Sequence, residues 1–209
     1  MSRILILRGA RGKTVRAKTS VIGVSVVVAL AATVGFTLFR PRAVQTPSDA
    51  ASTPPLRLAP DIEVTMYQGQ AEVGGEKIAL SDLWEKKRQP VVLNFWAGLC
   101  PPCRAEMPDF QRLYEQPKRK FDLIGVDIGP FINLGSRDDA RALLRELKIT
   151  YPAGTTFDIR TIRNYEILGM PTTVFITAGG RIWRKHAGLL TFNQVKALAD
   201  DLTRVSPSP

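Results

Sequence analysis

The chain has 209 residues, which allows one ordinary globular domain with accessory segments, and a formal net charge of +10 at pH 7. Residues 1–42 hold eight basic side chains and no acidic one, which leaves 21 basic against 19 acidic residues in the rest of the chain. The basic excess therefore belongs to the N-terminal segment. This distribution argues against a nucleic-acid-binding face on a folded domain, and we expect no nucleic-acid partner.

A hydrophobic run without charged residues extends from Thr19 to Phe39. Its 21 residues are long enough, at a rise of about 1.5 Å each, to cross a hydrocarbon core about 30 Å thick. More basic residues precede the run than follow it. We therefore predict a basic cytoplasmic segment (1–18), a transmembrane signal-anchor (19–39) and a C-terminal part outside the cytoplasm. A cleaved signal peptide is the alternative, although its apolar core is usually shorter.

Residues 40–59 are rich in proline, alanine, serine and threonine and predict an extended linker. We place one domain at 60–205. Within it, short apolar or alternating stretches predict strands, and apolar residues at three- and four-residue spacing predict helices. The predicted strands lie at residues 62–67, 77–80, 91–96, 121–127, 172–176 and 181–187, with a shorter strand near Tyr151 and a helical turn near 161–165. The main predicted helices begin after Ser81, Cys100, Ser136 and Thr191.

The order of these elements predicts an α/β fold with a mixed central sheet flanked by helices. The strands at 62–67 and 77–80 are expected to pair as an N-terminal hairpin through a turn at Gly74-Gly75. Ser81 is expected to cap a short helix. The helix starts at Ser136 and Thr191 carry Asp139 and Gln194 three residues later, which predicts a capping box at each.

The only two cysteines, Cys100 and Cys103, stand where the apolar strand 91–96 meets a helix. Pro101 and Pro102 occupy early helix positions, where a missing N–H is tolerated. A Cys-x-x-Cys pair delivered to a helix N-terminus is typical of a redox site, because the helix dipole lowers the pKa of the first thiol. We expect Cys100 to be the attacking thiolate and Cys103 the thiol that resolves the mixed disulfide.

Other roles fit the pair less well. A structural zinc site needs four ligands, and the sequence offers two cysteines and a distant His186. Covalent haem attachment needs a histidine after the second cysteine, where Arg104 stands. A structural disulfide remains open, although so short a loop gains little closure entropy. We therefore expect no metal and no cofactor at this pair.

The stretch from Asn94 to Cys103, the element order and Met170-Pro171-Thr172-Thr173 together resemble the thioredoxin superfamily. More narrowly, the chain resembles the membrane-anchored TlpA/ResA-type thiol–disulfide oxidoreductases of bacteria, over roughly residues 60 to 203. The resemblance implies a thioredoxin-like fold in which the proline matching Pro171 is cis and lies against the disulfide. It also implies a functional role for Glu106, three residues after the second cysteine, which could accept a proton from Cys103. An ordinary acid in the first helical turn is the alternative.

Two positions depart from the family pattern. Leu99 stands where many relatives carry tryptophan directly before the first cysteine, which bears on the partner-docking surface. Asn94 stands where cytosolic thioredoxins have a buried acid, so Glu106 would have to supply any internal base. In addition, Pro101 and Pro102 remove two N–H donors from the Cys100 thiolate, and this favours a reductant over an oxidant.

The sequence therefore predicts an extracytoplasmic, membrane-tethered protein-disulfide reductase. By resemblance, its client would be an apocytochrome c, reduced before haem attachment, and its electrons would come from a membrane thiol reductase. A disulfide-forming oxidase is one alternative. A copper metallochaperone is another, although its relatives tend to use Cys-x-x-x-Cys with a well-placed histidine. A peroxidase is disfavoured because no lone cysteine stands apart from the pair.

Overall fold

The structure, a computed structural model, describes residues 56–206. The predicted cytoplasmic segment, the predicted anchor and most of the predicted linker lie outside these residues. Across the described range, none of the helices combines the length and the apolar character that crossing a membrane requires. The anchor at 19–39 accordingly stays a prediction.

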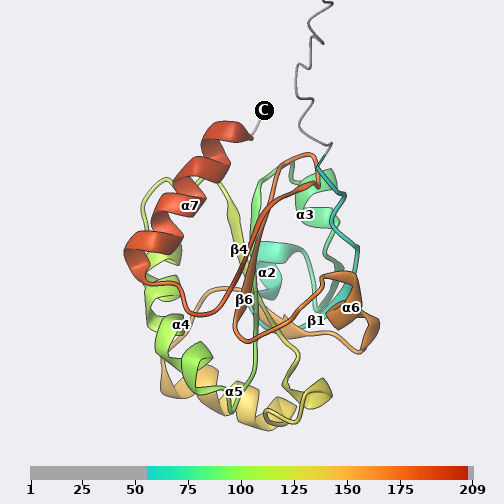
Figure 1. The fold of residues 1–209 in the computed structure, drawn as a ribbon, viewed down its shortest axis with the longest axis vertical. Helices are drawn as coiled ribbons and strands as arrows, with labels where there is room; N and C mark the ends of the chain where they lie inside the picture. Colours follow the sequence, from blue (N-terminus) through green and yellow to red (C-terminus); the bar gives the residue numbers. More distant parts are fainter. Residues whose placement is uncertain (1–55, 207–209) are drawn as a thin grey trace, which may run out of the picture. The chain divides into compact units, whose positions relative to one another are not determined.

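Seven strands form one mixed sheet, in the order β2-β1-β5-β4-β3-β6-β7. The strands are β1 (Glu63–Gln68), β2 (Lys77–Ala79), β3 (Val91–Trp96), β4 (Asp122–Asp127), β5 (Ala153–Thr155), β6 (Thr172–Ile176) and β7 (Ile182–Ala187). The helices are α2 (Gln70–Val73), α3 (Asp82–Glu85), α4 (Pro101–Tyr114), α5 (Arg137–Glu146), α6 (Arg160–Asn164) and α7 (Phe192–Val205), with a 3₁₀ turn at Gly129–Phe131. Figure 1 shows α4 and α7 on one side of this sheet and α2, α3 and α6 on the other. The predicted mixed sheet with flanking helices is confirmed.

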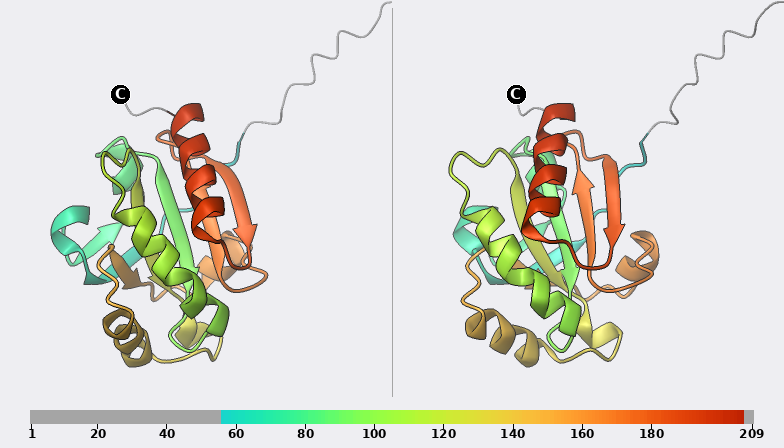
Figure 2. Two further views of the ribbon diagram at one scale, coloured as in Figure 1. Left: turned by 90° about the vertical axis from the view of Figure 1, so that its left-hand side faces the viewer. Right: turned by 60° about the vertical axis from the view of Figure 1, so that its left-hand side comes forward.

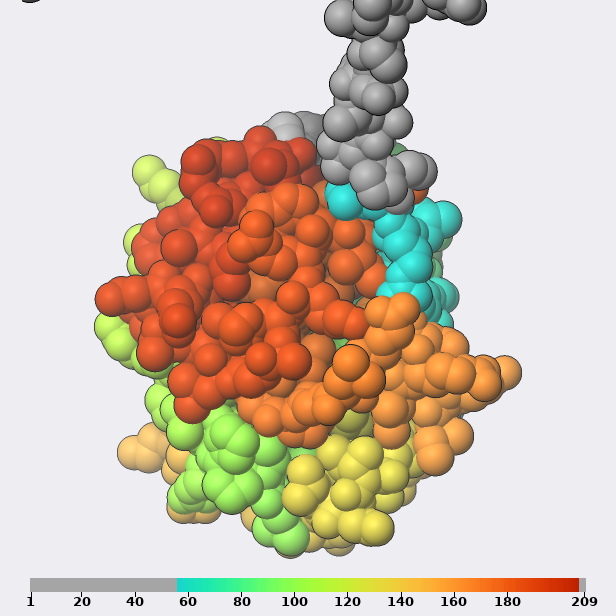
Figure 3. Space-filling view, in the orientation of Figure 1, coloured from blue at the N-terminus to red at the C-terminus, as the bar shows by residue number. Residues whose placement is uncertain are grey.

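The sheet separates two apolar cores. One core contains residues of α4, α5 and α7, and α4 and α7 run beside each other over this face (Figure 2). The other core contains residues of α2, α3 and α6. The space-filling view shows orange atoms of the segment that holds α6 and β7 beside red α7 on the outer surface (Figure 3). Strands β3, β4 and β6 are buried along their whole length, as their nearly continuous apolar sequences predict, whereas β7 at the edge of the sheet is only partly buried.

Strand β3 is the buried centre on which the candidate site is built. All six of its residues are buried. It runs parallel to β4, with Trp96 opposite Asp127, and antiparallel to β6, with Asn94 opposite Thr173. Its side chains alternate between the two cores, because successive residues of a strand point to opposite faces.

The N-terminal part of the sheet differs from the predicted simple hairpin. Strands β1 and β2 pair antiparallel, but α2 lies between them, and β1 also pairs antiparallel with β5. Gly69 and Gly74 flank α2 with φ angles of 80° and 102°, a backbone conformation that favours glycine. A Cβ on Gly69 would lie 2.6 Å from Cα of Pro152, so this glycine also allows the two segments to approach closely.

Helix starts were predicted with mixed success. Ser136 and Asp139 form the expected capping box at α5. At α7 the expected partner Gln194 accepts a hydrogen bond from the backbone N–H of Thr191 at 2.9 Å. The prediction for Ser81 is wrong in its detail: α3 does begin after it, but its side chain makes no capping hydrogen bond. Its backbone N–H is instead held by Oδ1 of Asp61 at 2.9 Å.

Candidate active site

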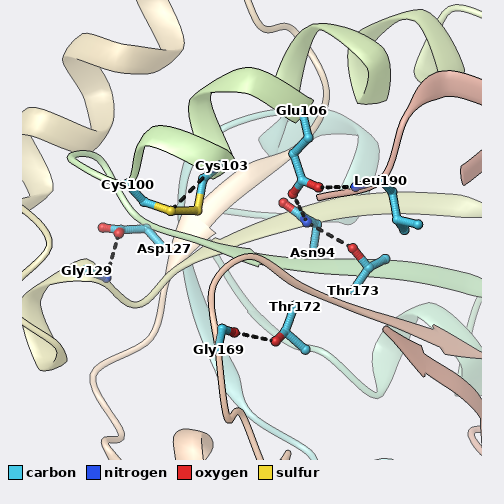
Figure 4. Close-up of a disulfide and its surroundings, with 10 residues drawn as sticks. All are labelled: Asn94, Cys100, Cys103, Glu106, Asp127, Gly129, Gly169, Thr172, Thr173 and Leu190. Atoms are coloured by element: carbon cyan, nitrogen blue, oxygen red, sulfur yellow. Dashed lines mark hydrogen bonds between the residues drawn. A yellow bond between two sulfur atoms is a disulfide. The ribbon is translucent and has the colours of Figure 1, made fainter. Parts of the chain in front are cut away.

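Cys100 and Cys103 form a disulfide at the N-terminus of α4, with 5.3 Å between their Cα atoms (Figure 4). Both residues are buried, at 2% and 0% exposure. Cys100 is the N-cap residue of the helix, and its Sγ accepts a hydrogen bond from the backbone N–H of Cys103 at 3.3 Å. Since Pro101 and Pro102 have no N–H, Cys103 is the first helical residue that can donate one.

The turn before Cys100 is held from outside the helix. The backbone N–H of Leu99 donates to the carbonyl of Leu134 at 2.8 Å. A Cβ on Gly98 would lie 2.6 Å from the backbone nitrogen of Ala140, so glycine allows this turn to pack against α5. The Leu99 side chain is 59% exposed. It lies on a shallow pocket beside the disulfide, which Gly98, Leu99, Cys100, Pro101 and Arg104 line.

Glu106 lies one helical turn after Cys103 and is only 1% exposed. Its Oε1 accepts a hydrogen bond from Nδ2 of Asn94 at 2.8 Å, and its Oε2 accepts one from the backbone N–H of Leu190 at 3.1 Å. Burial raises the pKa of Glu106 to about 7, although both hydrogen bonds oppose the rise. The side chain is therefore not an exposed first-turn acid, and it can gain or lose a proton near neutral pH.

Pro171 precedes β6, and the peptide bond between Met170 and Pro171 is cis, the conformation that the resemblance implies. The next two residues carry hydroxyl groups with defined partners. Thr172 donates through Oγ1 to the carbonyl of Gly169 at 2.6 Å. Thr173 accepts a hydrogen bond at Oγ1 from Nδ2 of Asn94 at 3.1 Å. The structure thus ties the segment after Pro171 to β3 and, through Asn94, to Glu106.

Sequence reasoning missed the part played by three buried polar residues, namely Asn94, Thr173 and Asp127. Asp127, at the end of β4, is 0% exposed and accepts hydrogen bonds from the Tyr67 hydroxyl and the Gly129 backbone N–H, both at 2.9 Å. Burial raises its pKa to about 6. In Figure 4 its side chain lies on the Cys100 side of the disulfide, whereas Glu106 lies on the Cys103 side. For Asn94, the sequence signal was a polar residue inside an otherwise apolar strand.

The remaining sequence candidate, His186, lies on β7 opposite Thr173 in the register of the sheet. Within residues 56–206 no group of three or more histidine, cysteine or acidic side chains is arranged to hold a metal ion. The residues that the structure gathers are Cys100, Cys103 and Glu106, joined by Asn94. This arrangement combines a reversible sulfur–sulfur bond with a nearby proton acceptor.

Comparison with known proteins is consistent with that chemistry. The sequence model of the AhpC/TSA family matches residues 56–185. The thiol-disulfide oxidoreductase ResA of Oceanobacillus iheyensis is 35% identical over 144 residues, which cover 69% of this chain and 70% of that protein. The thioredoxin-like protein YneN of Bacillus subtilis is 31% identical over 146 residues, which cover 66% of this chain and 82% of that protein.

Among solved structures, the exposed lipoprotein thioredoxin Etrx1 of Streptococcus pneumoniae is similar with a TM-score of 0.57. The match has 22% identity and covers 68% of this chain and 100% of that one. At this identity the likeness establishes the fold, which is thioredoxin-like.

Proposed function

The chain belongs to the AhpC/TSA family and is a thiol–disulfide oxidoreductase, and on that premise we propose that it reduces disulfides in client proteins outside the cytoplasm. The observation that carries the proposal is the Cys100–Cys103 pair at the start of α4 with Glu106 buried one turn below. In the reduced protein, the Cys100 thiolate attacks a client disulfide and forms a mixed disulfide. Cys103 then attacks Cys100 and releases the reduced client.

The start of α4 supports the reducing direction. A couple becomes more oxidising when its thiolate form is stabilised. Here the first two helical positions are Pro101 and Pro102, so only the Cys103 N–H is directed at Sγ of Cys100, at 3.3 Å. Fewer donors to the thiolate leave the thiol form more favoured, and a couple of this kind gives its electrons away more readily.

The direction is tested by measuring the reduction potential of the pair against glutathione. We expect a value near that of thioredoxin, about −270 mV, and far from that of the oxidase DsbA, about −120 mV. A potential close to the DsbA value would reject the reductase role and favour the disulfide-forming oxidase. The matched control is Cys103→Ser, which cannot form the intramolecular bond.

The client is tested by trapping. In the Cys103→Ser variant, the mixed disulfide at Cys100 cannot be resolved, so clients stay attached and can be identified by mass spectrometry. The likeness to TlpA/ResA-type proteins supports an apocytochrome c with an oxidised Cys-x-x-Cys-His motif as client. It also supports a membrane thiol reductase as the electron donor. The Cys100→Ser variant should trap no client, and capture of the same proteins by both variants would argue against the mechanism.

We further propose that residues 19–39 tether the domain to the membrane, with residues 1–18 in the cytoplasm. The charge-free apolar run and the basic residues before it support this topology. The full chain should remain in the membrane fraction after a carbonate wash, and a protease added outside the membrane should reach the domain. Release into the carbonate supernatant would argue for a cleaved leader instead.

A further inference from the structure

Asn94 lies within β3 and has no exposed surface, and its amide group faces two other elements. Its Nδ2 donates to Oε1 of Glu106 on α4 at 2.8 Å and to Oγ1 of Thr173 on β6 at 3.1 Å. Figure 4 shows the amide between the carboxylate and the hydroxyl. All three residues are at most 1% exposed, so the contacts are shielded from bulk water. One amide therefore links the helix of the cysteine pair to the strand that follows Pro171.

The oxygen atom of the same amide has no hydrogen-bond partner among the described residues. Oδ1 of Asn94 is buried and accepts no hydrogen bond from any described residue, which is uncommon for a buried polar atom. Rotation of the amide by a half turn would exchange Oδ1 and Nδ2 with little change in shape. The Thr173 hydroxyl can donate as well as accept, so it can pair with either end of the amide.

The two amide orientations match the two protonation states of Glu106. A carboxylate only accepts hydrogen bonds and pairs with Nδ2, whereas a carboxylic acid has an O–H that pairs with Oδ1. The backbone N–H of Leu190, which lies just before α7, holds the other carboxyl oxygen at 3.1 Å. Cys103 lies one turn before Glu106 on the same helix, and the Tyr151 phenol interacts electrostatically with the Glu106 carboxyl.

We propose that Asn94 is a positioning residue that turns its amide as Glu106 gains or loses a proton, and so supports proton transfer from Cys103. The inference rests on the proposed function. In the resolving step the Cys103 thiol gives its proton to the Glu106 carboxylate, and Sγ of Cys103 bonds to Sγ of Cys100. The bond between Cys100 and the client sulfur breaks, and the client thiolate takes a proton from water. The cysteine pair loses two electrons and the client disulfide gains them.

The test is the pH dependence of the resolving step in the full chain, held in detergent. The chain is joined at Cys100 to a fluorescent cysteine peptide, and release of the peptide is followed from pH 5 to pH 9. In Asn94→Leu both forms of Glu106 lose their amide partner, but the charge-assisted bond to the carboxylate is the stronger of the two, so Glu106 holds its proton to higher pH. In a plot of release rate against pH, the rate rises on the acidic side (the acid limb) as Glu106 loses its proton. We expect the pH at the midpoint of this limb to rise by about one unit, which corresponds to about tenfold slower release well below the midpoint. Release near pH 9 should approach that of the wild type.

Two further variants separate this role from a merely structural one. Gln111→Leu removes another buried amide of α4, which bonds to Thr150 at 2.7 Å and 2.9 Å, and it should leave the midpoint unchanged. In a chain that already carries Glu106→Gln, the further change Asn94→Leu should not alter the pH dependence of release. Equal slowing at every pH by Asn94→Leu would overturn the inference, as would a shift of the same size in Gln111→Leu.

Asn94→Asp is nearly isosteric and guards against misfolding of the leucine variant. It places two carboxyl groups within hydrogen-bonding distance, where they hold one proton between them, so the limb should move further up than in Asn94→Leu. An unmoved limb in Asn94→Asp overturns the inference. If the wild-type chain releases no peptide at any pH, the proposed function fails and this inference fails with it. If the wild-type chain releases the peptide normally and neither Asn94 variant shifts the midpoint of the acid limb, the inference about Asn94 is wrong and the proposed function stands.

Discussion

The backbone N–H of Leu190 donates a hydrogen bond to Oε2 of Glu106 at 3.1 Å, although 84 residues separate the two in sequence. Leu190 is itself buried, just before α7 begins. The contact holds the carboxyl between α4 and the segment leading to α7, away from bulk water. Burial at this place keeps the carboxyl protonated to a higher pH than in solution, against the effect of the Leu190 hydrogen bond, and this has consequences for stability as well as for chemistry.

The first prediction concerns the stability of the fold against pH. The pKa of Glu106 rises from 4.5 to about 7 on folding. Below the lower value the group is protonated in both states, and between the two values only the folded state keeps the proton. The contribution of Glu106 to the free energy of unfolding therefore falls as pH rises through this window, by about 3 kcal/mol in total. Urea unfolding at pH 4.5 and pH 8 measures the fall, and Glu106→Gln should remove the share of Glu106 while the share of Asp127, whose pKa is also raised, remains.

The matched control for that experiment is Glu85→Gln, which changes an exposed glutamate on α3. Its loss of stability between pH 4.5 and pH 8 should equal that of the wild type. If Glu106→Gln also behaved like the wild type, the carboxyl would not be held as a buried acid in the folded protein.

The second prediction concerns Leu99 and client docking. Its side chain is 59% exposed beside the disulfide, and as an aliphatic group it has no proton to give or accept. Leu99→Ala should lower kcat/KM for a folded client protein about three- to tenfold, because it removes apolar contact area. The reduction potential should not change. Val205→Ala, which truncates a 56% exposed side chain at the end of α7, is the control and should leave kcat/KM as it is.

The third prediction concerns Asp127, which anchors the end of β4. Asp127→Ala leaves the buried Gly129 N–H and the Tyr67 hydroxyl without their acceptor. We expect the free energy of unfolding to fall by about 2 to 4 kcal/mol in urea unfolding at pH 7. Asp138→Ala changes a 97% exposed side chain at the start of α5 and should cost less than about 0.5 kcal/mol. Equal losses in the two variants would contradict the anchoring role.

The fourth prediction compares two glycines near the site. A Cβ on Gly98 would lie 2.6 Å from the nitrogen of Ala140 and 2.7 Å from the carbonyl carbon of Asp139, both backbone atoms that cannot easily move aside. Gly98→Ala should therefore lower the free energy of unfolding by about 2 to 3 kcal/mol. Gly169→Ala meets nothing within 4 Å and should be tolerated. Thermal unfolding of the two variants side by side measures the difference.

Local sequence signals predicted the joint between β3 and α4, and the capping box of α5, because these depend on residues a few positions apart. The apolar run before Cys100 and the two prolines directly after it predicted that Cys100 and Cys103 stand at the start of α4. The sequence also pointed to Glu106, but its i+3 spacing from Cys103 does not say whether the side chain is buried. That depends on Leu190, which only the folded chain brings near.

The partners of Asn94 and Asp127 were out of reach for the same reason. Asn94 meets Thr173, 79 residues away, because β3 and β6 pair in one register. Asp127 meets Tyr67 because β1 lies next to β5, a placement that no local pattern reports. Polar residues in apolar strands are thus a usable signal that a partner exists, while the identity of the partner is a property of the topology.

The place of β3 between β4 and β6 also fixes the order in which the site can be completed. β4 follows β3 closely in the chain, but β6 ends only at Ile176. A chain made from its N-terminus has therefore exposed both cysteines long before the strand that carries Thr173 exists. Contacts of such long sequence separation slow the folding of a domain, because a long loop must be closed before they form. While the chain is being made, Cys100 and Cys103 are thus two thiols without the hydrogen-bonded neighbours of the folded site, because Thr173 is added to the chain later.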